Sequence, residues 1–309
     1  MTSERTSEST SETTAETRTE TRADAYAACR EITRTEARNF YYGIRLLPPA
    51  KRDALCALYA LARRIDDIGD GDLPVEQKRT ELAVVRKRLG AIDEVDDPVY
   101  AAVADAARRY PVPVGAFEEI VDGVELDLEQ VRVADVDELV RYCRLVAGSV
   151  GRLCLSIFGS TGLDHEVAAT YADQLGIALQ QTNILRDIRE DLLNDRIYLP
   201  ADELERFGVE LRVDETGSLA DPQARLAGYI RHAAARAEDW YGLGLRLVPH
   251  LDRRSAASCR AMAGIYHHLL RRIRSRPVAV YDQRLSLGGA EKVSVAVGSL
   301  LAGSGGGLR

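Results

Sequence analysis

The sequence predicts an all-α fold around a central cavity. Alternating apolar and polar residues, the pattern of half-buried strands, are nearly absent, whereas Ala, Leu, Arg and Glu, which favour helices, are abundant. Two predicted helices also carry a polar stripe flanked by apolar rows. On helices this hydrophobic, such a stripe indicates an internal cavity rather than open solvent.

Helical periodicity divides the chain into successive segments. In order, the predicted helices are 25–38, 49–69, 75–91, 97–109, 114–130, 135–160, 164–194, 220–248, 254–275 and 288–302. Pro48-Pro49 opens the second helix, because proline fits the first helical turn, and Pro200 ends the segment after the seventh. No linker rich in Pro or Gly interrupts the middle of the chain, so we expect a single domain.

We place this domain at residues 25–302, between two tails. Residues 1–24 are rich in Thr, Ser and Glu and lack an apolar stretch, which predicts a disordered tail and excludes a signal peptide. Residues 303–309 are Gly-rich and predict a flexible end.

Composition excludes several classes of protein. The net charge is −7 and no basic stripe with interleaved aromatic residues is present, so nucleic acid is not an expected partner. The five cysteines are scattered without CxxC spacing, which indicates reduced thiols in the cytoplasm rather than zinc or disulfides. No apolar run reaches the ~18 residues of a transmembrane helix. We therefore expect a cytoplasmic protein, with peripheral membrane contact left open.

Two acidic pairs with the same spacing carry the strongest functional signal. Asp66 and Asp70 form one pair, and Asp187 and Asp191 form the other. At a spacing of four residues, both carboxylates of a pair lie on one helix face and repel each other. Mg²⁺ is the natural counter-ion, because it takes oxygen ligands from one or two carboxylates together with substrate phosphate. Two such helices facing each other would clamp metal ions and a diphosphate.

Each acidic pair continues a longer polar stripe. The two stripes are Tyr59, Arg63, Asp66 and Asp70, and Gln180, Asn183, Asp187 and Asp191. A single DxxxD on a helix is usually a solvated face, but two of them in matching stripes argue for a shared site. Arginines accompany both pairs, and the planar guanidinium group suits phosphate oxygens.

At these residues the chain resembles the squalene/phytoene synthase family, the head-to-head trans-isoprenyl diphosphate synthases. The resemblance covers about residues 28–290 and rests on segments 39–48, 59–70, 142–151, 175–191 and 195–200. Within the family, ARNFYYGIRLLP and ARRIDDIGDG look most similar to bacterial presqualene diphosphate synthases of hopanoid and squalene pathways. One departure is Asn39, where many members carry Ser.

The resemblance implies an isoprenoid-synthase helical bundle and a role for each matching position. Mg²⁺, or Mn²⁺ as the alternative ion, would be held by Asp66, Asp70, Asn183, Asp187 and Asp191, with Gln180 in support. Diphosphate contacts would come from Arg38, Tyr59, Arg63, Arg186, Tyr266 and Arg284. The prenyl channel would be lined by Phe40, Val146, Ala147, Val150, Gly151, Leu175 and Leu179. Tyr142 and Tyr198 would lie near the reacting carbons.

The preferred function is condensation of two farnesyl diphosphates to presqualene diphosphate with release of diphosphate. NADPH is not expected as a cofactor, and the downstream partners would be enzymes of the squalene pathway.

The alternatives within the family are squalene, dehydrosqualene and phytoene synthases. A non-catalytic helical assembly protein would be expected to lose the aspartates, and a terpene cyclase usually carries Asn, Ser and Glu in its second metal motif. The sequence leaves prenyl chain length and oligomeric state open.

Overall fold

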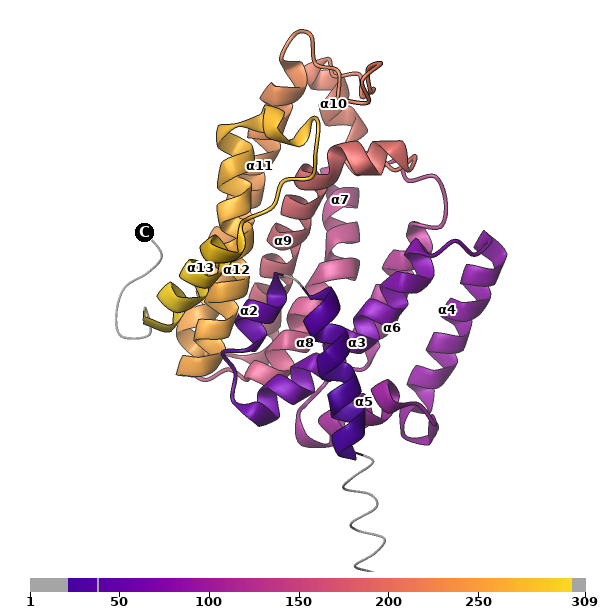
Figure 1. The fold of residues 1–309 in the computed structure, drawn as a ribbon, viewed down its shortest axis with the longest axis vertical. Helices are drawn as coiled ribbons and strands as arrows, with labels where there is room; N and C mark the ends of the chain where they lie inside the picture. The colour runs from indigo at the N-terminus through magenta and orange to yellow at the C-terminus, as the bar shows by residue number, and fades with distance from the viewer. Residues whose placement is uncertain (1–21, 38, 302–309) are drawn as a thin grey trace, which may run out of the picture.

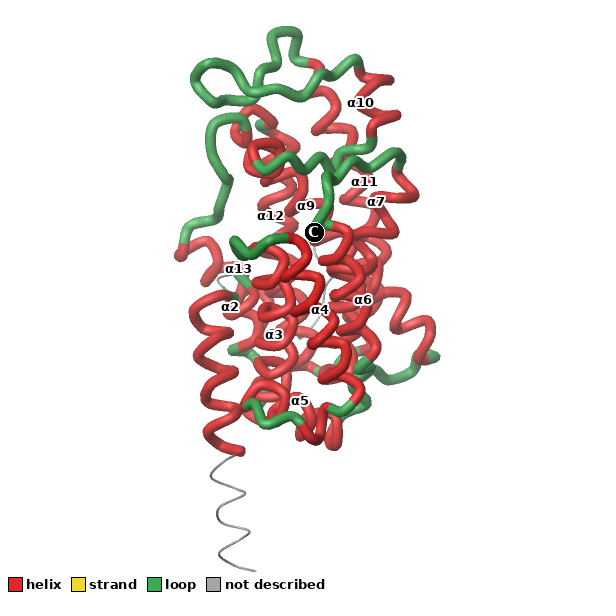
Figure 2. The backbone as a smooth tube through the Cα atoms, turned by 90° about the vertical axis from the view of Figure 1, so that its right-hand side faces the viewer, coloured by secondary structure: helices red, strands yellow, loops and turns green. Residues whose placement is uncertain are grey.

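The computed structural model describes residues 22–37 and 39–301, which form an elongated bundle of helices (Figure 1). Most helices run along the long axis, and loops gather at the end that carries α10 (Figure 2). The described residues contain no strand, only the isolated bridges Arg132–Ile197 and Val213–Leu219. The predicted all-α class is therefore confirmed.

The bundle consists of helices of very different length. After helical residues 22–36, the elements are α2 (Phe40–Ile44), α3 (Pro49–Asp70), α4 (Val75–Gly90), α5 (Pro98–Arg109), α6 (Gly115–Leu126), α7 (Val136–Cys143), a π-helical segment (Arg144–Gly148), α8 (Ser149–Phe158), α9 (His165–Leu193), α10 (Ala201–Phe207), α11 (Arg225–Gly244), α12 (Arg253–Ser275) and α13 (Gly289–Leu301). Short 3₁₀ turns occupy Ile92–Glu94, Leu245–His250 and Pro277–Val280.

The structure differs from the predicted elements at α2, at α10, within residues 135–160 and at residues 22–24. The short helices α2 and α10 were not predicted, although Pro200 followed by acidic residues is a recognisable start for α10. The predicted helix 135–160 contains a π-helical segment, which periodicity at this length does not reveal. Residues 22–24, assigned to the tail, are already helical, and Arg22 pairs with Asp105 at 3.6 Å.

Two apolar cores pack on either side of the interior. One joins α3, α5, α6 and α8, and the other joins α7, α9, α11 and α12. The longest helix, α9, packs against α8, α11 and α12, whereas α3 packs against α5, α6 and α8. A cavity separates the inner faces of α3 and α9, which carry the two acidic pairs.

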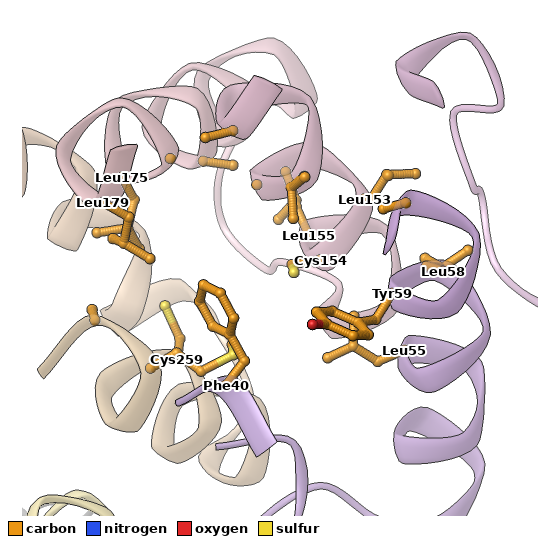
Figure 3. A pocket seen from close by; sticks show the side chains of 18 of the residues that line it. Phe40, Leu55, Leu58, Tyr59, Leu153, Cys154, Leu155, Leu175, Leu179 and Cys259 are labelled. Atoms are coloured by element: carbon orange, nitrogen blue, oxygen red, sulfur yellow. The ribbon is translucent and has the colours of Figure 1, made fainter. Parts of the chain in front are cut away.

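All five cysteines are free thiols, and four of them are buried. Cys154, the fifth, is partly exposed because it faces the cavity (Figure 3). Across residues 22–301, apart from residue 38, no helix combines the length and the apolar character that crossing a membrane requires.

Candidate active site

A deep apolar cavity lies between α3, α8, α9 and α12. It encloses about 1260 Å³, including its open mouth. Phe40, Tyr59 and Leu155 point toward a common space from three different helices (Figure 3). Asp66 lines one end of this cavity and Leu55 lies eleven residues earlier on α3, about 16 Å along a helix axis. The cavity is thus elongated along α3 and apolar except at the end that Asp66 lines, and we call it the tail cavity.

A second, polar cavity of about 780 Å³ adjoins the first. Its wall contains all four predicted aspartates together with Asp127, and we call it the acidic chamber. The two cavities share Asp66, Val146, Gln180 and Asn183, so they are parts of one continuous site. An elongated ligand with an anionic head and an apolar tail matches this division.

Most of the predicted site residues are brought together here. The tail cavity is lined by Phe40, Tyr59, Arg63, Asp66, Val146, Ala147, Val150, Gly151, Leu175, Leu179, Gln180 and Asn183. The acidic chamber adds Asp70, Tyr142, Asp187, Asp191 and Tyr198. Three others lie behind this wall: Tyr266 stacks on Phe40, and Arg186 and Arg284 contact Asp187. Arg38 lies outside the described residues.

The carboxylates of the chamber disturb one another's protonation. Burial and then Asp187 raise the pKa of Asp191 to about 7. The pKa of Asp66 also rises to about 7, first by burial, while Arg63 opposes this shift and Asp70 adds to it. The Asp66 side chain is nevertheless exposed to the cavity, and water there weakens the effect of burial on its pKa. Repulsion between the carboxylates therefore remains as a cause of the raised pKa. A bound cation would reverse both shifts.

Comparison with known proteins decides the family. Residues 33–291 match the squalene/phytoene synthase family. This chain belongs to that family. The synthase is 59% identical over 276 residues to a protein named phytoene synthase from Mycobacterium tuberculosis, which covers 89% of this chain and 90% of that protein. It is 33% identical to chloroplastic phytoene synthase 2 of Zea mays, over 87% of this chain and 68% of the plant protein.

Solved structures of related proteins have the same fold as the synthase. A dehydrosqualene synthase in complex with a ligand superposes with a TM-score of 0.79 at 26% identity, covering 90% of this chain and 96% of the other. Squalene synthase HpnC from Alicyclobacillus acidocaldarius gives a TM-score of 0.69 at 27% identity, covering 82% and 94%. The predicted isoprenoid-synthase bundle is therefore confirmed.

Arginines neutralise part of the acidic chamber of the synthase. Arg186 is buried and donates two hydrogen bonds to Asp187, and Arg284 donates to the same carboxylate at 2.8 Å. Arg196, which the sequence analysis did not select, pairs with Asp70 across the chamber at 3.4 Å. The buried Nε of Arg63 has no hydrogen-bond partner among the described residues. Arg63 and Arg196 line the two cavities, where an anionic ligand would meet the carboxylates, whereas Arg186 and Arg284 contact Asp187 from outside the lining.

Asp127 is the functional candidate that the sequence analysis missed. It follows α6 and accepts hydrogen bonds at 2.8 Å from both Tyr142 and Tyr198. Burial raises its pKa, although both tyrosine hydrogen bonds oppose that rise. The two phenol rings stack with centroids 4.9 Å apart. No spacing rule marks Asp127, because its partners lie 15 and 71 residues further along the chain.

The oxygen-rich chamber fits a hard divalent cation. Asn183 Oδ1 is buried, and none of the described residues donates a hydrogen bond to it. Between residues 22 and 301, with 38 left out, no three His, Cys, Asp or Glu side chains form a ready-made metal cluster. Mg²⁺ suits such a site, since it commonly takes one or two carboxylates and completes its shell with water and substrate phosphate.

Proposed function

We propose that this synthase joins two molecules of geranylgeranyl diphosphate head to head to make phytoene. The observation that carries the proposal is the 59% identity, over 89% of the chain, to mycobacterial proteins named phytoene synthase. The sequence motifs alone favoured farnesyl diphosphate and presqualene diphosphate. Identity along the whole domain outweighs two short segments, so we adopt phytoene, one of the alternatives that the sequence left open.

The continuous site supports a prenyl diphosphate as substrate. The diphosphate would lie in the acidic chamber beside Arg63 and the aspartates, and the prenyl chain would extend into the tail cavity. Asp66, Asp70, Asp187 and Asp191, with Asn183, would hold Mg²⁺ there. When bound, the ion would supply positive charge that neutralises the departing diphosphate.

The reaction follows from this arrangement. The C1–O bond of one substrate breaks, and its electron pair leaves with the diphosphate, which Arg63 can stabilise by hydrogen bonding. The apolar wall keeps water from the allylic cation. The double bond of the second substrate attacks this cation, and loss of a proton closes a cyclopropane. Departure of the second diphosphate, rearrangement and loss of a second proton give phytoene, so no reductant is consumed.

The two stacked tyrosines of the acidic chamber have two roles in this proposal. Tyr142 and Tyr198 present aromatic faces, which stabilise a nearby carbocation. Their hydroxyl groups donate to Asp127, so the carboxylate fixes both rings and can help to accept a proton.

A second candidate is the conversion of farnesyl diphosphate to presqualene diphosphate. It is favoured by the resemblance of residues 39–48 and 59–70 to presqualene diphosphate synthases, and by the 26% and 27% identity to a dehydrosqualene and a squalene synthase. The chemistry up to the cyclopropane is the same. The two candidates differ in chain length and in whether the second diphosphate leaves.

One experiment separates the candidates. The purified protein is incubated with Mg²⁺ and either farnesyl or geranylgeranyl diphosphate, with and without NADPH, and the products are identified by mass spectrometry. We expect phytoene from geranylgeranyl diphosphate, with no requirement for NADPH. Presqualene diphosphate as the main product from farnesyl diphosphate, with little turnover of the longer substrate, would replace our proposal with the second candidate.

A further inference from the structure

An ionic network centred on a buried carboxylate lies behind one wall of the tail cavity. Asp173 on α9 is 8% exposed, and its carboxylate contacts two arginines of the facing helix. Arg144 Nε donates to Asp173 Oδ2 at 3.0 Å, and Arg152 Nη1 lies 3.3 Å from the same oxygen. Arg152 continues the network to Glu119 on α6 at 2.5 Å. Two carboxylates and two guanidinium groups thus connect α6, α8, α9 and the π-helical segment.

Gly148 makes room for this arrangement. It lies midway between Arg144 and Arg152, so all three face α9 on successive turns. A Cβ atom on Gly148 would lie 2.9 Å from Asp173 Oδ1. Because glycine has no side chain, the Asp173 carboxylate has the space to contact both arginines.

The network fixes a segment that also lines the cavity. Arg144 and Gly148 are the first and last residues of the π-helical segment, and Val146 and Ala147 between them line the tail cavity. Segments of π-helix are rare and frequently occur at functional sites.

Backbone packing couples this segment directly to α9. A Cβ on Gly176 would overlap the Ala147 carbonyl, and one on Gly151 would overlap that of Ala172. All four of these residues line the tail cavity. If the backbone of α9 shifts at Asp173, the facing backbone at Ala147 and Gly151 must shift with it, because no flexible side chain lies between them. Such a shift therefore moves the wall of the tail cavity.

We propose that Asp173 is a positioning residue that fixes the shape of the tail cavity and thereby the prenyl chain length that the synthase prefers. This inference rests on the proposed function, since it concerns the substrate tail. Net stabilisation of the fold does not explain the network well, because buried ion pairs are often no more stabilising than well-packed apolar residues. A role in holding the π-helical segment in one conformation does explain the network.

The test compares Asp173→Asn with Asp105→Asn. The control residue is also a buried carboxylate that pairs with an arginine, Arg109 at 3.0 Å, but it lies on α5, and no residue of α5 lines either cavity. Two quantities are measured for each variant and for the wild type. One is the ratio of kcat/KM for geranylgeranyl and farnesyl diphosphate, and the other is hydrogen exchange of the amides in residues 144–151. Thermal unfolding gives the loss of stability.

We expect Asp173→Asn to change the kcat/KM ratio by at least about threefold and to speed exchange in residues 144–151 by about tenfold. In Asp105→Asn both quantities should stay at wild-type values even where stability falls. If Asp173→Asn does not fold, Arg144→Gln replaces it, because the Arg144 side chain is 59% exposed and its loss leaves Arg152 in place.

The outcomes separate this inference from the function on which it rests. An unchanged ratio with unchanged exchange in residues 144–151, in a variant that has merely lost stability, overturns the role of Asp173. A wild-type protein that converts neither substrate overturns the proposed function instead. In that case the exchange measurement alone decides whether Asp173 fixes the π-helical segment.

Discussion

Tyr142 and Tyr198 stack face to face with ring centroids 4.9 Å apart, and each hydroxyl group donates a hydrogen bond to a different oxygen of Asp127. One carboxylate thereby orients two aromatic rings that come from opposite sides of α9 in the sequence. All three residues line the acidic chamber.

This relationship gives the first prediction. Asp127→Asn should lower kcat by about 10- to 100-fold, because the amide can no longer accept from both phenols or take up a proton. Steady-state kinetics with circular dichroism as a folding check measures this. Asp122→Asn is the matched control on α6, where the carboxylate pairs with Arg86 away from the site. A wild-type rate for Asp127→Asn would remove Asp127 from the mechanism.

The acidic pairs should differ in their effect on stability. Asp66→Ala relieves repulsion and should leave the free energy of unfolding unchanged or raise it by about 0.3 kcal/mol. Asp187→Ala leaves the buried Arg186 without its carboxylate partner and should cost about 3 kcal/mol. Both variants should lose nearly all turnover. Urea titrations give the free energies, and equal stability of the two variants would contradict the pairing seen here.

Removal of divalent ions should abolish turnover. The carboxylates of each pair repel each other without a cation, and the chamber offers only oxygen ligands of the kind that Mg²⁺ takes. Excess chelator should stop product formation and added Mg²⁺ should restore it. Mg²⁺ together with inorganic diphosphate should also raise the melting temperature, because both bind only the folded protein. Full activity in excess chelator would refute the metal requirement.

Two glycine substitutions should have opposite effects on stability. Gly176→Ala places a methyl group against the Ala147 carbonyl and should cost about 1 to 3 kcal/mol. Gly242→Ala on α11 meets no atom within 4 Å and should stabilise the protein by about 0.5 to 1 kcal/mol through helix propensity. Thermal and urea unfolding of the two variants measures both effects. A neutral Gly176→Ala would mean that the backbones of the π-helical segment and α9 can separate easily.

Asp252 should stabilise the fold in a pH-dependent way. Its side chain caps α12 and accepts a hydrogen bond from Lys51 at 2.7 Å. Partial burial raises its pKa, but the hydrogen bonds from Lys51 and Ser255 outweigh this and hold the pKa below its usual range. A lowered pKa in the folded state means that stabilisation is complete above about pH 4 and is lost as the pH falls below it.

The corresponding variant is Asp252→Ala, which should cost about 1 kcal/mol at neutral pH through loss of the helix cap. The difference from wild type should shrink in acid. A difference in melting temperature that stays constant as the pH is lowered would show that the carboxylate charge is not the cause.

The sequence by itself determined the helical class and which polar side chains share one face of a helix. Apolar residues at helical spacing specify helices wherever they occur in the chain, and the DxxxD pairs place two carboxylates on one face of a helix whatever surrounds it. For this reason the metal-type aspartates, Gln180 and Asn183 could be selected from spacing alone. Residues along the same stripes, such as Tyr59 and Arg63, follow from the same periodicity.

Only the tertiary structure decided which distant residues complete the site. Asp127 reaches Tyr198 from 71 residues away, and Arg284 reaches Asp187 from 97 residues away. Neither contact leaves a local pattern, because it depends on how loops and helix ends cross in space. The π-helical segment and the Asp173 network likewise leave no local pattern in the sequence. They arise from close packing of two helices through Gly148, Gly151 and Gly176, and packing of that kind is a property of the assembled bundle.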